Sequence, residues 1–261
     1  MDICKLPTVL RSRGFRLYTE GGKRLIDLWL NGGAAVLGHT PPNLLRELKN
    51  TASRGLYAPY PHFTERRFIK ALSKLLPGYC FRIYAAPPIS CRGTEIKFWR
   101  PYTNPENPFA VDDAPLLIPV LPGIHTWRGG DGMPLGLCVI AAKSEEHLSQ
   151  LPQSDALSPI LLAAAARGVH DLLAAPERVK PKLPRVEKTL KNSSSKWQKR
   201  GIYLTLKNKP APEEWDALFR KFLEAGFLLP PTPTHPVILP GELSSGEEAK
   251  LAVLLDITSC Q

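Results

Sequence analysis

The side chains best suited to chemistry in this chain are six histidines, five cysteines and the adjacent acids Asp112 and Asp113. No two histidines have the HxxxH or HExxH spacing with which one helix holds a metal ion, so we expect no metal site. The cysteines are odd in number and form no CxxC pair, which predicts reduced thiols. Asp112 and Asp113 lie in an expected loop, where a solvated role is more ordinary than a catalytic one.

Motifs for nucleophilic catalysis and for nucleotide binding are also absent from the sequence, which contains no GxSxG elbow, no P-loop and no GxGxxG. Two glycine-containing segments remain, CRGTE at 91–95 and GGDGMPLG at 129–136. Backbone N–H groups at a turn that opens a helix can bind phosphate without any lysine. The alternative is that Gly93 only permits the turn and that Arg92 points into solvent.

Much of the net charge of +10 comes from one stretch, 178–200, which holds nine Lys and Arg residues and a single acid, Glu187. Such a stretch is typical of a nucleic-acid footprint, but also of a solvated helix face. The periodic apolar residues Leu183, Val186 and Leu190 favour the helix face, so we expect no nucleic-acid partner. No window approaches the roughly 20 apolar residues of a membrane helix, and the amino-terminal segment lacks the apolar core of a signal peptide. We expect a cytoplasmic protein.

The elements that would position these residues alternate between short strands and helices. Alternating apolar residues on both sides of Glu20-Gly21-Gly22 predict a β-hairpin over 14–30. Apolar periodicity, starting prolines and ending glycines predict helices over 42–55, 64–76, 143–150, 158–174 and 212–226, with a capped helix after Ser244 or Ser245. Short apolar runs predict strands at 81–85, 115–122, 136–142, 201–207, 227–231 and 235–240.

The order of motifs at the two ends of the chain is more specific than any single motif. GFRLYTEGGKRLIDLWLNGGAAVLGHTPP, residues 14–42, resembles the opening of class III (fold type I) aminotransferases, which use pyridoxal phosphate (PLP). There a hairpin leads into a glycine-rich loop and an LGHxxP motif. The segment EEWDALFRKFLEAGFLLPP, residues 213–231, is similar to the carboxyl-terminal part of the glutamate-1-semialdehyde aminomutase branch. The resemblance covers roughly residues 14–85 and 200–258.

The middle of the chain resembles this family only in fragments. The CRGTE segment is similar to the family's S-G-T-E-A turn, whose backbone N–H groups bind the phosphate of PLP, and Arg92 replaces its serine. The segment 154–159 is similar to one that reaches the phosphate of the neighbouring subunit, with Ser154 in place of a threonine. The resemblance therefore implies a vestigial phosphate site made of Arg92, Gly93, Thr94 and Ser154.

The lysine that binds PLP is missing from its place. GGDGMPLG resembles the loop that follows this lysine, and Trp127 stands at the place of the lysine, followed by Arg128. The family's reaction needs a lysine amine for the imine with PLP and for the proton shift. Trp127 has no ionisable group, and Arg128 stays protonated. The resemblance thus implies a chain that has lost the residue on which the chemistry depends.

Most of the family's large domain is also missing, between Thr103 and Asp113. The aromatic residue that would stack on the PLP ring and the aspartate that would hold the ring nitrogen protonated have no counterpart here. Lys97 and Lys143 are the only lysines of the middle region, and both are expected on the surface of a strand or a helix.

We therefore expect an α/β fold. A small antiparallel sheet with helices is built from both chain ends, residues 1–80 and 180–261, and packs on a strongly reduced remnant of the large domain, residues 81–179. We expect no catalytic residue.

For function we expect a degenerate aminotransferase-like protein that acts as a binding or scaffold protein, with PLP implied by resemblance only. A homodimer is expected because the helix 158–174 is apolar nearly all round and needs a cover. A small anionic ligand is a further possible partner. Two alternatives remain: a PLP-binding aminotransferase or aminomutase that uses another lysine, and a basic nucleic-acid-binding module.

Overall fold

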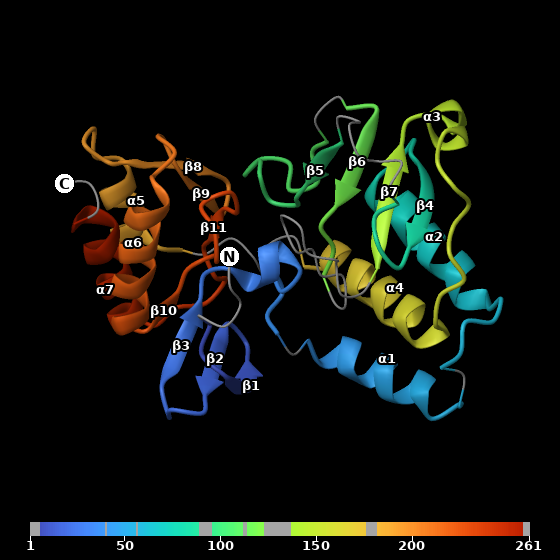
Figure 1. The fold of residues 1–261 in the computed structure, drawn as a ribbon, viewed down its shortest axis with the longest axis horizontal. Helices are drawn as coiled ribbons and strands as arrows, with labels where there is room; N and C mark the ends of the chain where they lie inside the picture. Colours follow the sequence, from blue (N-terminus) through green and yellow to red (C-terminus); the bar gives the residue numbers. More distant parts are fainter. Residues whose placement is uncertain are drawn as a thin grey trace. The chain divides into compact units, whose positions relative to one another are not determined.

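A computed structural model describes residues 6–39, 41–55, 57–88, 96–111, 114–122, 137–175 and 182–257. Helices and strands alternate along the chain, which confirms the expected α/β class (Figure 1). The chain divides into two compact units. Unit 1 combines residues 1–32, 36–39 and 177–261, and unit 2 combines residues 33–35 and 40–176.

The first sheet of unit 1 joins the two ends of the chain. It has the order β1 (Val9–Arg13), β2 (Arg16–Thr19), β3 (Arg24–Asp27) and β10 (Phe227–Leu228). The antiparallel pair of β2 and β3 confirms the predicted hairpin. Strand β10 lies parallel to β3, so this sheet is antiparallel except at its last pair. A parallel pair needs a long crossover connection, and the chain between Asp27 and Phe227 supplies it.

The second sheet of unit 1 has the order β11 (Val237–Ile238), β9 (Tyr203–Leu206) and β8 (Trp197–Arg200). The helices of this unit are α5 (Pro184–Leu190), α6 (Pro212–Glu224) and α7 (Ser245–Ile257). The basic stretch is thus only partly helical, because Trp197 is buried opposite Leu206 and begins a strand. Within α5 the interpretation as a solvated face is confirmed, since Val186 is buried while Arg185 and Lys188 are exposed.

Helix α7 is fixed to the first sheet by Glu247. The predicted cap forms at Ser244: its N–H donates to Glu247 Oε2 over 2.8 Å, and its Oγ accepts from Glu247 N–H over 3.3 Å. Arg16 donates to both carboxylate oxygens over 2.7 and 3.2 Å, and Arg24 adds a third bond of 3.2 Å. Burial disfavours the charged carboxylate, but the bonds from Arg16 and Ser244 outweigh it and lower the pKa of Glu247 to about 2.

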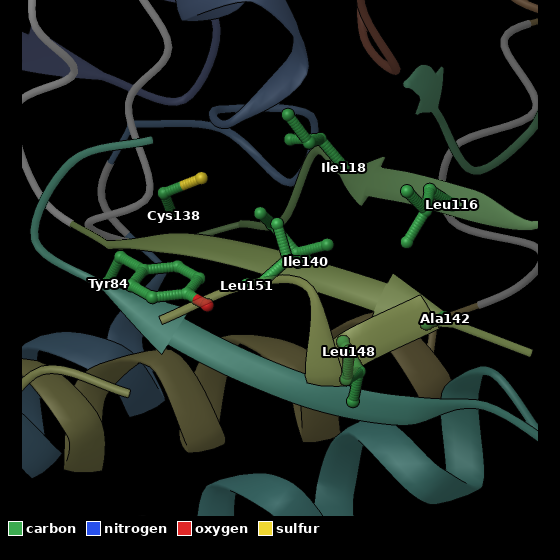
Figure 2. Close-up of a cluster of buried hydrophobic side chains, with 8 residues drawn as sticks. All are labelled: Tyr84, Leu116, Ile118, Cys138, Ile140, Ala142, Leu148 and Leu151. Atoms are coloured by element: carbon green, nitrogen blue, oxygen red, sulfur yellow. The ribbon is translucent and has the colours of Figure 1, made fainter. Parts of the chain in front are cut away.

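Unit 2 contains a sheet in the order β4 (Cys80–Tyr84), β7 (Cys138–Ala142), β6 (Leu116–Pro119) and β5 (Lys97–Trp99). Strand β7 is antiparallel to both neighbours, and only β5 and β6 run parallel. All five residues of β7 are buried, as its continuous apolar run predicts. Figure 2 shows Ile118, Cys138 and Ile140 rising from the strands on the side away from the helices.

The helices of unit 2 are α1 (Pro42–Ala52), α2 (Phe63–Leu75), α3 (Glu145–Ser149) and α4 (Pro159–Leu173). Helix α4 packs against α1 and α2, and Leu162, Ala166 and Val169 are buried along it (Figure 1). Residues 40–80 therefore belong to unit 2, whereas the sequence-based division grouped them with the carboxyl-terminal segment. Because α1 and α2 cover α4 within one chain, its apolar surface does not by itself require a second copy. No helix of the described ranges is long and apolar enough to cross a bilayer.

The Glu247 cluster generates a stability prediction. Glu247→Gln removes the negative charge that Arg16 and Arg24 share, which should lower the free energy of unfolding by about 1.5–3 kcal/mol near neutral pH. The folded-state pKa lies below the ordinary value of 4.5, so this stabilisation is complete above 4.5 and is lost as the pH falls towards about 2.

Urea denaturation near neutral pH and at about pH 3 measures the effect. The difference between wild type and variant should shrink at the lower pH. Glu20→Gln, at an exposed turn position, is the matched control and should change stability by less than about 0.5 kcal/mol at both. An equal loss for both variants would show that Glu247 has no special role.

Candidate functional site

The structure describes one of the four residues of the expected phosphate site. Arg92, Gly93 and Thr94 lie outside the described residues, and so do Trp127 and Arg128. Ser154 is described and lies in the segment between α3 and α4.

Ser154 lies beside the end of strand β4. Its Oγ accepts a hydrogen bond from the N–H of Ile83 over 3.1 Å, and the N–H of Asp155 donates to the Ile83 carbonyl over 2.9 Å. Asp155 Oδ2 accepts from the N–H of Ala85 over 2.8 Å, and the Tyr84 hydroxyl donates to the Pro152 carbonyl over 2.7 Å. These bonds fix the segment on β4. The half-buried Ser154 hydroxyl still has a proton to donate, so it is suited to assist an anion and unsuited to bind one alone.

The lysines of the middle region do not replace the missing one. Lys97 lies on β5 with an exposed side chain, and Lys143 follows β7 and is exposed as well. An imine-forming lysine is activated by removal from water or by a cationic neighbour within a pocket. Neither described lysine is in such a place, and Trp127 and Arg128 offer no amine that forms an imine. These residues do not fit covalently bound PLP.

Asp27 and His39 form a polar pair where strand β3 ends. Asp27, at the end of β3, is buried, and its Oδ2 lies 2.8 Å from His39 Nε2. Its Oδ1 accepts from the N–H groups of Trp29 and Leu30 over 2.8 and 2.9 Å. The N–H of His39 donates to the Gly14 carbonyl over 2.8 Å. The pair thus ties the loop to the hairpin.

The loop that this pair holds is conformationally demanding. Leu30, Asn31 and Gly32 have φ of 46°, 50° and 70°, and a positive φ is costly for a residue such as leucine. The buried Trp29 Nε1 has no hydrogen-bond partner among the described residues. Gly38 has φ of 91°, and an added Cβ would lie 3.2 Å from the Gly14 carbonyl oxygen. The hydrogen bonds of the Asp27 carboxylate to Trp29, Leu30 and His39 all hold this loop in place.

Metal binding and redox chemistry find no support in the part of the chain that the structure describes. No group of three His, Cys, Asp or Glu residues there is placed to hold an ion. Cys80 and Cys138 lie on the neighbouring strands β4 and β7. Burial, together with Glu145, raises the pKa of the Cys80 thiol, so its reactive thiolate form is disfavoured.

The fold is shared with solved aminotransferases. An ornithine aminotransferase from Plasmodium yoelii matches with a TM-score of 0.66 over 97% of this chain and 93% of that chain, at 12% identity. An omega-transaminase from Sphaerobacter thermophilus matches with 0.66 over 99% and 92%, also at 12% identity. The adenosylmethionine-8-amino-7-oxononanoate aminotransferase from Methanocaldococcus jannaschii matches with 0.66 over 98% and 93%, again at 12%. At this identity the likeness establishes an aminotransferase-like fold and nothing finer.

Comparison of sequences gives relatives of unassigned function. An uncharacterized protein of Treponema pallidum (strain Nichols) is 27% identical over 291 residues, which cover 89% of this chain and 88% of that protein. An uncharacterized protein of Borreliella burgdorferi is 48% identical over 67 residues, or 26% of this chain and 25% of that one. No protein-family model matches the chain.

The Asp27–His39 cluster generates a prediction about Gly38, which lies next to His39. Gly38→Ala forces a side chain into a left-handed conformation against the Gly14 carbonyl, so it should lower the free energy of unfolding by about 1–3 kcal/mol. Gly21→Ala is the matched control, because a Cβ there meets no atom within 4 Å and the backbone needs no positive φ. It should leave stability unchanged or raise it by less than about 1 kcal/mol. Equal thermal midpoints for both variants would contradict the strained loop.

Proposed function

We propose that this chain is a degenerate aminotransferase-like protein that acts as a binding or scaffold protein and has no transaminase activity. One observation carries the proposal: Trp127 stands where the resemblance places the PLP lysine. Bound PLP would supply an electron sink, but its use in transamination needs an amine that attaches it and moves a proton. The exposed positions of Lys97 and Lys143 support the same conclusion.

Derivation from the glutamate-1-semialdehyde aminomutase branch is part of this proposal. Its support is the carboxyl-terminal sequence, where α6 leads through Phe227–Leu228 to a proline pair and then to α7. A cytoplasmic location is supported by the free thiols of Cys80 and Cys138.

A small anionic ligand at Arg92, Gly93, Thr94 and Ser154 is the binding role that the resemblance suggests. Ser154 supports this role, because its Oγ accepts the N–H of Ile83 on β4 and its hydroxyl proton can still be donated to an anion. Affinity for phosphate or for free PLP should be weak, near millimolar or about 4 kcal/mol, because only backbone N–H groups, one hydroxyl and Arg92 would contribute.

The first prediction from this proposal is that the purified protein carries no PLP on a lysine. Incubation with PLP followed by borohydride reduction and peptide mass spectrometry should give no pyridoxyl adduct above the level found for surface lysines of an unrelated protein. An active aminotransferase treated in parallel is the positive control. A stoichiometric adduct would refute the proposal and favour the alternative of a non-standard lysine. Lys97→Arg and Lys143→Arg would then identify the residue.

The second prediction is that the chain forms a homodimer. It rests on the family resemblance, in which the segment that corresponds to 154–159 reaches the phosphate of the neighbouring subunit. The apolar helix α4 does not support a dimer, because α1 and α2 cover it within the chain. Sedimentation at micromolar concentration should give twice the 28.9 kDa mass of one chain. A monomer over the whole accessible concentration range would leave the binding role intact but remove the inherited assembly.

A further inference from the structure

A basic groove lies on unit 1, and its lining includes none of the residues of the implied phosphate site. It encloses about 710 Å³ and is lined by four lysines, namely Lys196, Lys207, Lys209 and Lys221. We call it the lysine groove. Ser193 and Asn208 add a hydroxyl and an amide to the lining.

Two elements bring these lysines together. Strands β8 and β9 form a hairpin in which Trp197 lies opposite Leu206, and just beyond this pair the N–H of Lys207 donates to the Lys196 carbonyl over 2.8 Å. Lys196 and Lys207 therefore mark one end of the hairpin, and Lys209 follows in the loop to α6. The other wall is one face of α6, where Glu214, Ala217, Leu218 and Lys221 are spaced as helical neighbours.

The wall formed by α6 is firmly anchored. Trp215, Phe219 and Phe222 are buried on a different face of this helix, and the Trp215 indole N–H donates to the Pro230 carbonyl over 3.3 Å. The helix cannot turn its lysine away from the groove without exposing these aromatic side chains to water. The α6 wall of the groove is therefore held in place.

The charge of the groove is unbalanced. Its one acidic lining residue is Glu214, and the Glu214 carboxylate already accepts the N–H of Ala211 over 2.9 Å in the cap of α6. None of the ion pairs between described residues includes any of the four lysines. A concave surface with like charges and low-dielectric walls focuses a positive potential and attracts anions.

We propose that the lysine groove binds a small polyanion, a molecule with two or more phosphate or carboxylate groups. Its volume lies in the range of about 300–1,000 Å³ that is usual for small-molecule sites. Leu206 and Leu218 supply apolar surface for the body of the ligand, while the ammonium groups act as point charges for its anionic groups. Single-stranded nucleic acid is disfavoured, because its binding relies on stacking on aromatic residues and no lining residue is aromatic.

Inorganic pyrophosphate is the probe, titrated into the full chain in a calorimeter at moderate salt, about 0.1 M. It should bind at one site, and Lys221→Gln should weaken the affinity by about tenfold, the loss expected for one charge-assisted contact. Arg220→Gln is the matched control, because it removes one positive charge from the exposed neighbouring position of the same helix, outside the groove. Its effect should stay below about twofold at moderate salt.

Ala217→Glu places a carboxylate inside the groove on an exposed helix position and should abolish binding without loss of helix content by circular dichroism.

The proposal is overturned if pyrophosphate does not bind at millimolar concentration, or if Arg220→Gln and Lys221→Gln weaken binding equally. It is also overturned if Arg92→Ala alone abolishes binding, since the anion would then belong to the phosphate site that the sequence resemblance implies. Tighter binding of a single-stranded RNA of about 10 nucleotides, lost in the same lysine variants, would assign the groove to nucleic acid instead. None of these outcomes depends on whether PLP attaches to a lysine.

Discussion

The parallel pairing of β3 with β10 is the constraint on which unit 1 depends, because it joins two segments from opposite ends of the chain. Phe227 lies opposite Ile26 and Leu228 opposite Asp27, and the Ile238 N–H donates to the Leu28 carbonyl over 2.7 Å. Closing so long a loop costs entropy, but that cost grows only slowly with loop length. The middle of the chain can therefore be shortened or lengthened while unit 1 keeps the same contacts.

The same strand also organises the strained loop that follows it. Asp27 is the last residue of β3, so its carboxylate is buried at a position fixed by Leu228 on the neighbouring strand. From there it accepts the N–H groups of Trp29 and Leu30 and contacts His39. A buried carboxylate with several good hydrogen bonds can hold a backbone conformation that the sequence alone would not favour. Loop geometry, in this case, follows from strand pairing between the chain ends.

How much of this fold the sequence predicts depends on how local each signal is. Helix α7 is predictable because Ser244 and Glu247 lie within one turn and cap each other, and the hairpin of β2 and β3 because its turn is marked by adjacent glycines. Strand β8 is not predictable in this way, since only Trp197 of its four residues is buried and the rest belong to the basic stretch. Strand β5 likewise presents only Trp99 to the core. The boundary between the two units near residue 40 depends on the packing of α1 and α2 against α4. Such contacts join residues far apart in the sequence, so local patterns do not predict them.

The two candidate sites also differ in how local their sequence signals are. Ser154 was identified from a short sequence resemblance, and its contact with β4 requires a strand from a distant part of the chain. The lysine groove was not identified, because in the sequence its lysines come from three separate segments and look like an ordinary solvated surface. They form one surface only after β9 pairs with β8 and the buried aromatic side chains orient α6.

Catalysis with PLP and the binding of an anion place different demands on a fold. Chemistry on PLP depends on one amine at one place, and no redistribution of charge replaces that amine. An anion site depends on several donors that act together, so it can form wherever a surface collects cations. Under the proposed function, the chain would therefore lack the amine needed for catalysis while its surfaces could still bind anions.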